Sequence, residues 1–547
     1  MSVQHPPGRP VGSPAGDSAF RRAIPCHEPA TGKVLGEAEA MDATAVREVV
    51  RKARAAQAAW GQTSFAERRA FMRELLDEIL ASQERICEIA VRDSGKTMVD
   101  AALGEVFPVC EKIRYLIENG EDDLRPEERS SGFLQHKRAR VEYHPLGVVA
   151  VICPWNFPFH NIYCPMVPAL FAGNAVVAKV GEHTTWSAEP LMAITKRVLE
   201  RRGHDPELVQ LVIGYGDSGE ALVRSDVDKV FFTGSPENGV KVMAAASDRL
   251  TPVVLELGGK DPMIVCDDAD LDHAVEQAML GVFTACGQMC VGAERIYVQA
   301  GVYDEFLRRA LARVETLRQG SALDEQVDLG AMTMPRQLDI LDELVADARA
   351  KGARVLIGGE RNASAGEQFF SPTILADVHH GMRITQEEQF GPIMVVMKFD
   401  TDREAVRLAN DCPYGLGSSI FSRDPARAER IAAAVRAGMT VINDYGLAYM
   451  IQSLPFGGVG RSGFGRINGR EGLRACCNTK AVVTDRVALG GGVSVYPIVD
   501  ATFPLVRNVI ETIYAPTAMA KGRAAGRTLR HAVDVARARM AFRKRGR

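Results

Sequence analysis

Residues 147–158, Gly-Val-Val-Ala-Val-Ile-Cys-Pro-Trp-Asn-Phe-Pro, place a run of small apolar side chains directly before a polar motif. The continuous apolar run from Gly147 to Ile152 predicts a strand that is buried on both faces. A second such run, Ala175 to Lys179, follows after a segment long enough to form a helix. This alternation predicts a βαβ unit and therefore a parallel sheet.

Further apolar runs continue the alternation along the chain. Residues 209–213, 229–232 and 252–257 extend the first sheet, and residues 40–120 read as helices. A second β/α series starts at residues 262–265 and goes on through 295–298, 393–399 and 418–421. The predicted fold class is α/β, with a Rossmann-like parallel-sheet cofactor domain followed by a second α/β domain.

Composition sets the broad class of protein. The chain has 547 residues, of which 46% are hydrophobic and 25% charged, so we expect a globular, soluble protein of two to four units. Its eleven Cys residues show no disulfide framework spacing, and no secretory segment opens the chain, which favours the cytoplasm.

The uncharged stretch 162–178 contains two Pro residues, a Gly and an Asn, so we read it as helix, turn and strand and not as a membrane span. We expect no nucleic-acid partner.

Two short motifs offer a carboxylate and a thiol. They are Glu256-Leu257-Gly258-Gly259-Lys260 and Gly287-Gln288-Met289-Cys290. A thiolate is a strong nucleophile and a carboxylate can activate water, so the pair suits covalent capture followed by hydrolysis. Either residue alone would say little, because free Cys is among the most buried residue types.

The other motifs give these two a context. In chain order they are Pro154-Trp155-Asn156-Phe157-Pro158, Lys179-x-x-Glu182, Phe232-Thr233-Gly234-Ser235, the two motifs above, Glu388-Gln389-Phe390-Gly391-Pro392 and Pro455-Phe456-Gly457-Gly458. This ordered set resembles the NAD(P)-dependent aldehyde dehydrogenase superfamily, from about Ile24 to about Asp485. Several motifs in the correct order are far more specific than any one of them.

The resemblance implies a catalytic set. Cys290 would attack the aldehyde carbon, and the Asn156 side-chain amide with the Cys290 backbone N–H would stabilise the resulting oxyanion. Glu256 would activate the water that releases a carboxylic acid, and Lys179 would tune the site. Because a free thiol has a pKa of about 8.5, we expect a lowered pKa at Cys290.

The resemblance also implies a cofactor site for NAD. Lys179 and Glu182 would hold the adenosine ribose, Ser235 the pyrophosphate, and Glu388 the nicotinamide ribose beside Phe390. A Glu182 carboxylate accepts bonds from a free ribose hydroxyl and repels a 2′-phosphate, so NAD is favoured over NADP. Outside the family context, Lys179 and Glu182 would more commonly be a surface ion pair. The full predicted cofactor set is Trp155, Lys179, Glu182, Gly216, Phe232, Thr233, Gly234, Ser235, Leu257, Glu388 and Phe390.

A substrate pocket is predicted around the thiol. It comprises Phe157, His160, Met289, Val291 and Phe456, with His160 interpreted as a polar wall and not as a proton carrier. Few charged residues occur in these segments, which favours neutral aliphatic or aromatic aldehydes; the sequence does not identify which one. Cys286 and Cys290 have a spacing that some metal sites use, but no matching His or Cys pair lies nearby, so no metal is expected.

These motifs divide the chain into domains. We expect a disordered leader over 1–22, an NAD-binding domain over 23–129 and 146–257, and a catalytic domain over 258–458. The resemblance implies an oligomerisation arm from 130–145 and 474–486, and hence a homodimer or homotetramer. Residues 487–547 form a C-terminal extension.

The extension departs from the common pattern of the superfamily. Residues 521–547 hold ten Lys or Arg and one Asp, while the whole chain has a net charge of −3. Apolar side chains recur at helical spacing beside these cations, as in helices that lie at a membrane surface. The stretch from Tyr445 to Gly458 also resembles a tail-bearing subgroup of plants and fungi. Peripheral membrane contact and packing on the protein's own oligomer both remain open.

Two alternative functions also remain open. Aldehyde dehydrogenases that transfer the acyl group to coenzyme A generally lack a carboxylate at the position of Glu256, so its presence favours water as the acceptor. A non-catalytic binding protein could retain the fold, but Cys290, Glu256 and Asn156 are all in place.

Overall fold

The computed structural model describes residues 23–487 and 495–545, which form two compact units. The first unit comprises residues 23–125 and 143–478, and the second comprises residues 126–142 and the described residues from 479 onward. The leader predicted over residues 1–22 lies outside the described residues.

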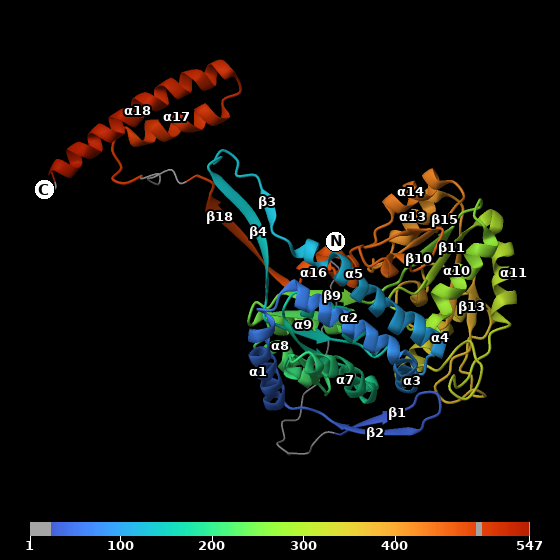
Figure 1. The fold of residues 1–547 in the computed structure, drawn as a ribbon. Coiled ribbons are helices and arrows are strands. Elements are labelled where there is room, and N and C mark those ends of the chain that lie inside the picture. Colours follow the sequence, from blue (N-terminus) through green and yellow to red (C-terminus); the bar gives the residue numbers. More distant parts are fainter. Residues whose placement is uncertain (1–22, 488–494, 546–547) are drawn as a thin grey trace, which may run out of the picture. The chain divides into compact units, whose positions relative to one another are not determined.

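A six-stranded sheet forms the first half of unit one (Figure 1), with the strand order β17-β9-β8-β5-β6-β7. Its parallel strands are β5 (Val148–Ile152), β6 (Ala175–Lys179), β7 (Val209–Val212), β8 (Lys229–Gly234) and β9 (Val253–Leu257). The predicted parallel sheet is therefore confirmed. A short late strand, β17 (Gly463–Phe464), pairs antiparallel with β9 and was not predicted.

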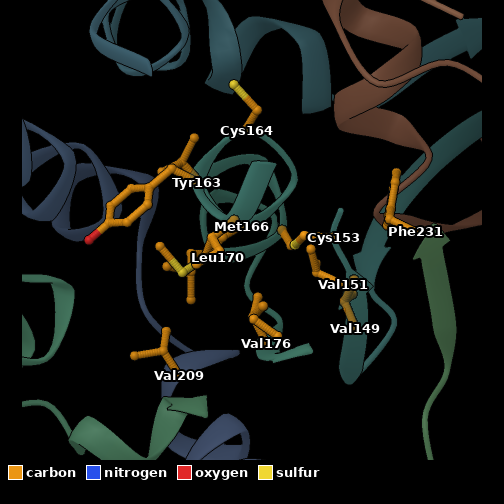
Figure 2. Packing of buried hydrophobic residues seen from close by; sticks show 14 of the residues in the cluster. Val149, Val151, Cys153, Tyr163, Cys164, Met166, Leu170, Val176, Val209 and Phe231 are labelled. Carbon is orange, nitrogen blue, oxygen red and sulfur yellow. The ribbon is translucent and has the colours of Figure 1, made fainter. Parts of the chain in front are cut away.

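Helices cover this sheet because its central strands are apolar along their whole length. Strands β5 and β6 are buried at every residue. Helices α6 (His160–Phe171) and α7 (Thr185–Arg201) contact the sheet, as do α1 (Ala43–Trp60), α8 (Gly216–Arg224) and α9 (Pro236–Ser247). Figure 2 shows Tyr163 and Met166 of α6 in one apolar cluster with Val151 and Val176 of the strands.

The remaining elements of this half pack around those helices. Asp42 caps α1, with its side chain accepting from the Thr44 and Ala45 amides. The other elements are the hairpin β1 (Ala23–His27) and β2 (Val34–Glu39), α2 (Phe65–Ala81), α3 (Gln83–Ser94), α4 (Met98–Ala101), a π-helical turn (Ala102–Val106), α5 (Phe107–Leu124) and α16 (Gly469–Arg474).

A seven-stranded sheet forms the second half, with the order β12-β13-β14-β11-β10-β15-β16. Its strands are β10 (Pro262–Val265), β11 (Arg295–Gln299), β12 (Arg354–Ile357), β13 (Thr373–Ala376), β14 (Ile393–Phe399), β15 (Ser419–Phe421) and β16 (Val441–Ile442). All are parallel except the pair β12–β13. The helices of this half are α10 (Leu271–Phe283), α11 (Tyr303–Val314), α12 (Pro335–Ala350), α13 (Asp402–Asn410), α14 (Pro425–Ala434) and α15 (Leu447–Met450). The four strands predicted for the second series are all present.

A three-stranded sheet and a helical hairpin make up unit two. The sheet contains β3 (Glu127–Arg129), β4 (Lys137–Pro145) and β18 (Cys477–Asp485), and the hairpin contains α17 (Thr502–Tyr514) and α18 (Ala518–Arg545). The arm therefore differs from its predicted bounds, since β3 lies inside the stretch given to the cofactor domain. Its last strand starts at Cys477, because residues 469–474 complete a helix. Within the described residues, no helix combines the length and apolarity that a bilayer crossing needs.

One buried amide joins three segments of unit one. Asn174 is fully buried, and its Oδ1 accepts from the Leu146 and Gly147 amides at 2.7 and 2.9 Å. Its Nδ2 donates to the carbonyls of Ala169 and Cys476 at 3.0 and 2.9 Å. All four hydrogen-bonding positions of the amide are used, so this side chain fixes the start of β5, the end of α6 and the approach to β18.

We expect Asn174→Ala to lower the free energy of unfolding by about 2–4 kcal/mol, because it leaves buried backbone groups without partners. The matched control is Asn119→Ala, which removes one exposed bond to the Tyr115 carbonyl and should change stability by less than about 0.5 kcal/mol. Thermal unfolding followed by circular dichroism measures both. Equal midpoints for the two variants would contradict this account.

Candidate active site

The carboxyl ends of β5, β6, β8 and β9 open into one cleft of about 1590 Å³. Parallel strands present their ligand sites at this edge of a sheet. The structure brings nearly all the predicted residues together there. The cleft is lined by Trp155, Asn156, Phe157, His160, Lys179, Glu182, Phe232, Thr233, Gly234, Ser235, Glu256, Leu257, Met289, Cys290, Val291, Glu388 and Phe390.

Two predicted residues do not line this cleft, although Phe456 packs in the same apolar cluster as Cys290. Gly216 begins α8 and is not among the residues that line the cleft. Phe456 lines a smaller cavity of about 40 Å³, which also borders Glu256, Cys290, His160 and Tyr449.

The Cys290 thiol lies in an apolar cluster with Val291, Phe456 and Tyr449. Burial raises the pKa of Cys290 well above its ordinary value, and the neighbouring carboxylate of Glu256 raises it further. The expected lowering of this pKa is therefore wrong for this structure. The physical reason is that the environment of the sulfur is apolar and acidic, whereas lowered thiol pKa values need nearby positive charge.

Glu256 is a buried acid in a dry environment. Burial raises the pKa of Glu256 to about 7, and its Oε1 has no hydrogen-bond partner among the described residues. A carboxylate with a pKa near neutrality is a competent general base at physiological pH. Since Cys290 lies beside it, Glu256 can remove a proton from a water that attacks a group bound to the sulfur.

The loop that carries Cys290 is held in an unusual backbone conformation. Ala285, Cys286 and Gly287 have φ angles of 49°, 57° and 73°, three successive residues in the left-handed region. Such a conformation costs free energy and needs support from its surroundings. Gln288 supplies this support, because its side chain donates to the Ala285 carbonyl at 3.1 Å and accepts from the Thr333 amide at 2.9 Å.

Cys286 is a buried part of this loop, and no group that could hold a metal ion occurs in the described residues.

Gly258 and Gly259 of the Glu-Leu-Gly-Gly-Lys motif allow three segments to meet. A Cβ at Gly258 would lie 2.4 Å from the Glu388 carboxylate, and one at Gly259 would lie 2.2 Å from the Cys290 carbonyl. The Gly259 amide donates to Glu388 Oε1 at 2.9 Å. Side chains at these positions would therefore push apart the segments that carry Glu256, Cys290 and Glu388.

A buried ion pair positions the Asn156 turn. Lys96 and Glu105 are both buried, and the Lys96 ammonium contacts Glu105 at 2.5 Å and the Asn156 carbonyl at 2.7 Å. The other Glu105 oxygen accepts from the amides of Phe159 and His160 at 3.1 and 2.9 Å. Glu105 belongs to the π-helical turn, a feature often found at functional sites. Sequence reasoning missed both residues of this pair.

The far end of the cleft fits an adenosine ribose and a pyrophosphate. Lys179 is 6% exposed, and its ammonium is 4.0 Å from Glu182, which leaves donors free to face a polyhydroxylated ligand. Ser235 caps α9 and accepts from the Asn238 amide, so a helix N-terminus with its unsatisfied N–H groups opens into the cleft. The residues present therefore suit a dinucleotide.

The part of the cleft predicted to hold the nicotinamide contains aromatic rings and a second buried ion pair. Trp155 and Phe390 meet edge to face at 5.5 Å. Lys260 binds Glu294 at 2.8 Å, and the Glu294 carboxylate accepts from the amides of Gln389 and Phe390. This pair holds the segment that carries Glu388 and Phe390.

The cleft also contains wall residues that sequence reasoning missed. Leu103 and Phe107 are 55% and 51% exposed, lie four residues apart and line the cleft together with Tyr445, Tyr449 and Met450. The apolar pair Leu103 and Phe107, four residues apart, has a helical spacing that is visible in the sequence. Nothing local to Tyr445 or Tyr449 indicated their position, because the segment from 445 to 450 reaches the cleft only through the tertiary fold.

Comparisons with known proteins agree with this geometry. The model of the aldehyde dehydrogenase family matches residues 16–482. An aldehyde dehydrogenase-like protein of Schizosaccharomyces pombe is 40% identical, with 90% of this chain and 96% of that protein covered. A 4,4′-diapolycopene aldehyde oxidase of Methylomonas sp is 36% identical, with 90% of this chain and 91% of that protein covered. A crystal structure of betaine aldehyde dehydrogenase from Staphylococcus aureus in complex with NAD+ has a TM-score of 0.81 and 29% identity, with 87% of this chain and 96% of that chain covered. The chain belongs to the aldehyde dehydrogenase family.

Proposed function

We propose that this protein oxidises an aldehyde to a carboxylic acid through a covalent intermediate on Cys290, with Glu256 as the base that releases it. The observation that carries the proposal is that a half-buried thiol and a carboxylate with a pKa of about 7 lie side by side in a cleft that is also lined by Lys179, Glu182 and Ser235. Membership of the family supports the reaction class, and the geometry supports the roles assigned to Cys290 and Glu256.

Separate residues of the protein have separate roles in the proposed reaction. The Cys290 sulfur attacks the aldehyde carbon, its proton passes to the aldehyde oxygen, and a thiohemiacetal forms. Asn156 Nδ2 and the Cys290 amide face the oxyanion that develops, and such a donor contributes a factor of about 10²–10³ in rate. Bound NAD supplies the hydride acceptor. After oxidation the cysteine carries a thioester, and Glu256 removes a proton from the water that hydrolyses it.

The cofactor proposal is NAD in preference to NADP. Glu182 lies beside Lys179 and is 40% exposed at the ribose end of the cleft, where a carboxylate accepts from ribose hydroxyls and repels a 2′-phosphate. The S. aureus relative was solved with NAD+.

The substrate proposal is a neutral aldehyde with an aliphatic or aromatic body. Phe157, Leu103, Phe107 and Met450 supply apolar walls to the cleft. A relative is named for 4,4′-diapolycopene aldehyde, which fits the same preference. The alternative of acyl transfer to coenzyme A is disfavoured by the base at Glu256, which has no partner for Oε1 among the described residues and can activate water.

The Glu256→Gln variant tests the division of roles. We expect it to form about one NADH per active site and then nearly stop, because the thioester forms but its hydrolysis has lost the base, a loss of about 10²–10⁴. Stopped-flow absorbance measures the burst amplitude and the steady rate. Glu237→Gln is the control, since this exposed carboxylate lies at the cleft rim and pairs with Arg461. Undiminished steady turnover in Glu256→Gln would reject the role.

The pH dependence follows from the same carboxylate. Burial raises the pKa of Glu256 to about 7, and only the deprotonated form is a base, so kcat should rise about tenfold per pH unit below 7 and level off above it. Steady-state assays between pH 5.5 and 9 check this, with circular dichroism at each pH as the control for folding. A kcat that stays flat from pH 5.5 to 7.5 would contradict it.

We also propose that the hairpin of α17 and α18 binds an anionic membrane surface, while the rest of the enzyme stays cytoplasmic and the arm of β3, β4 and β18 mediates homodimer or homotetramer formation. The supporting observation is that the hairpin leaves large apolar side chains exposed among many arginines. They are Phe503, Val506, Ile510, Tyr514, Met519, Leu529, Val533 and Met540. Each cation near an anionic lipid contributes about 1 kcal/mol.

Co-sedimentation with vesicles tests this second proposal. We expect the full chain to pellet with phosphatidylserine-containing vesicles and to be released by high salt, whereas a variant without residues 495–547 should stay in solution. Neutral phosphatidylcholine vesicles are the control for charge. Equal pelleting of the two proteins would exclude the membrane and leave packing within the oligomer.

A further inference from the structure

A chain of four polar side chains ends at the predicted oxyanion donor. The Tyr449 hydroxyl contacts His160 Nε2, and His160 Nδ1 lies 3.2 Å from Asn161 Oδ1. Asn161 Nδ2 donates to Asn156 Oδ1 at 3.0 Å, and Asn156 Nδ2 donates to the Gln288 carbonyl at 2.9 Å. The chain borders the 40 Å³ cavity next to Glu256 and Cys290. The proposed reaction leaves Tyr449, His160 and Asn161 without a role.

The backbone carbonyl of Gln288 fixes the direction of the whole chain. A carbonyl can only accept, so the Asn156 amide must turn Nδ2 toward it and Oδ1 toward Asn161. Asn161 must then present its Nδ2 to Asn156, which leaves its Oδ1 to accept from His160. His160 must therefore carry its proton on Nδ1 and accept at Nε2, and Tyr449 must be the donor at the end.

The environment of these four hydrogen-bonded side chains favours the protonation states that the directions of their hydrogen bonds require. Burial lowers the pKa of His160 to about 3, so the ring is neutral and Nε2 has a free lone pair. Burial also raises the pKa of Tyr449 well above its ordinary value, so the phenol keeps its proton. The positive charges of the Lys112 and Lys96 ammonium groups also disfavour a charged imidazole at His160.

The chain leaves one donor available at Asn156. The amide nitrogen carries two hydrogens, and only the one directed at Gln288 has a partner among the described residues. The Asn156 oxygen is occupied by Asn161, so the side chain cannot flip without breaking contacts at both ends. The second N–H belongs to a side chain that lines the cleft together with Cys290.

We propose that Tyr449 and His160 are positioning residues, which act through Asn161 to hold the Asn156 amide with its free N–H toward the developing oxyanion. The inference rests on the proposed function, because it assigns the oxyanion to Asn156. Preorganised donors are effective because they do not reorient during the reaction. Loss of the chain should therefore cost less than loss of the donor itself, about tenfold against about 10²–10³.

A double-mutant cycle on the NADH burst rate tests this proposal. Tyr449→Phe should slow the burst about tenfold in the wild-type background and leave it unchanged in the Asn156→Ala background, where no amide remains to be oriented. Tyr163→Phe is the matched control. Tyr163 lies on the same helix as His160, and its buried hydroxyl donates to the Leu191 carbonyl at 2.7 Å. Removing this hydroxyl should lower the melting temperature without changing the burst rate.

A rescue experiment adds a second readout. His160→Asn can still place an N–H near Asn161, whereas His160→Leu cannot, so the Asn variant should retain a burst several-fold faster than the Leu variant. Two outcomes would overturn the proposal: a full tenfold loss from Tyr449→Phe in the Asn156→Ala background, or equal burst rates for His160→Asn and His160→Leu. A wild-type enzyme with no aldehyde-dependent burst would instead refute the proposed function.

Discussion

The active site depends on the close approach of three chain segments at Gly258 and Gly259. The first sheet ends in Glu256, the nucleophile loop supplies Cys290, and the second half contributes Glu388. These segments can approach this closely only because residues 258 and 259 have no side chains. A Cβ at either glycine would come within 2.4 Å of an atom of the neighbouring segment. Every chemical property of the site follows from this crowding.

Crowding buries charged and polar groups, and burial then sets their chemistry. Glu256 becomes a base near neutrality, while burial and the acidic neighbours keep the resting Cys290 thiol protonated. The structure holds this arrangement with two buried ion pairs, Lys96–Glu105 and Lys260–Glu294, which fix backbone amides and carbonyls on both sides of the cleft. In the same way, the hydrogen-bonded side chains from Tyr449 to Asn156 hold the proposed oxyanion donor in position.

Much of the fold was predictable because its signals are local. The strands from Val148 to Ile152 and from Ala175 to Lys179 are continuous apolar runs, and they lie where the sequence placed them. The cleft residues were predictable because they follow those strands. The antiparallel return at Gly463–Phe464 was not, since a two-residue strand has no periodicity. The pKa of Cys290 depends on Glu256, and the role of His160 depends on Tyr449; both neighbours are brought close by the tertiary fold, which no local pattern records.

The central claim is that a covalent bond forms at the sulfur of Cys290 and that Glu256 releases it. Peptide mass spectrometry of the acid-quenched Glu256→Gln variant, incubated with an aldehyde and NAD, tests this directly. The account predicts that the peptide containing Cys290 gains the mass of the acyl group, and that omitting NAD or replacing Cys290 with Ala abolishes the gain. An unmodified Cys290 peptide at the time of NADH formation, or an adduct on another cysteine such as Cys286, would contradict it.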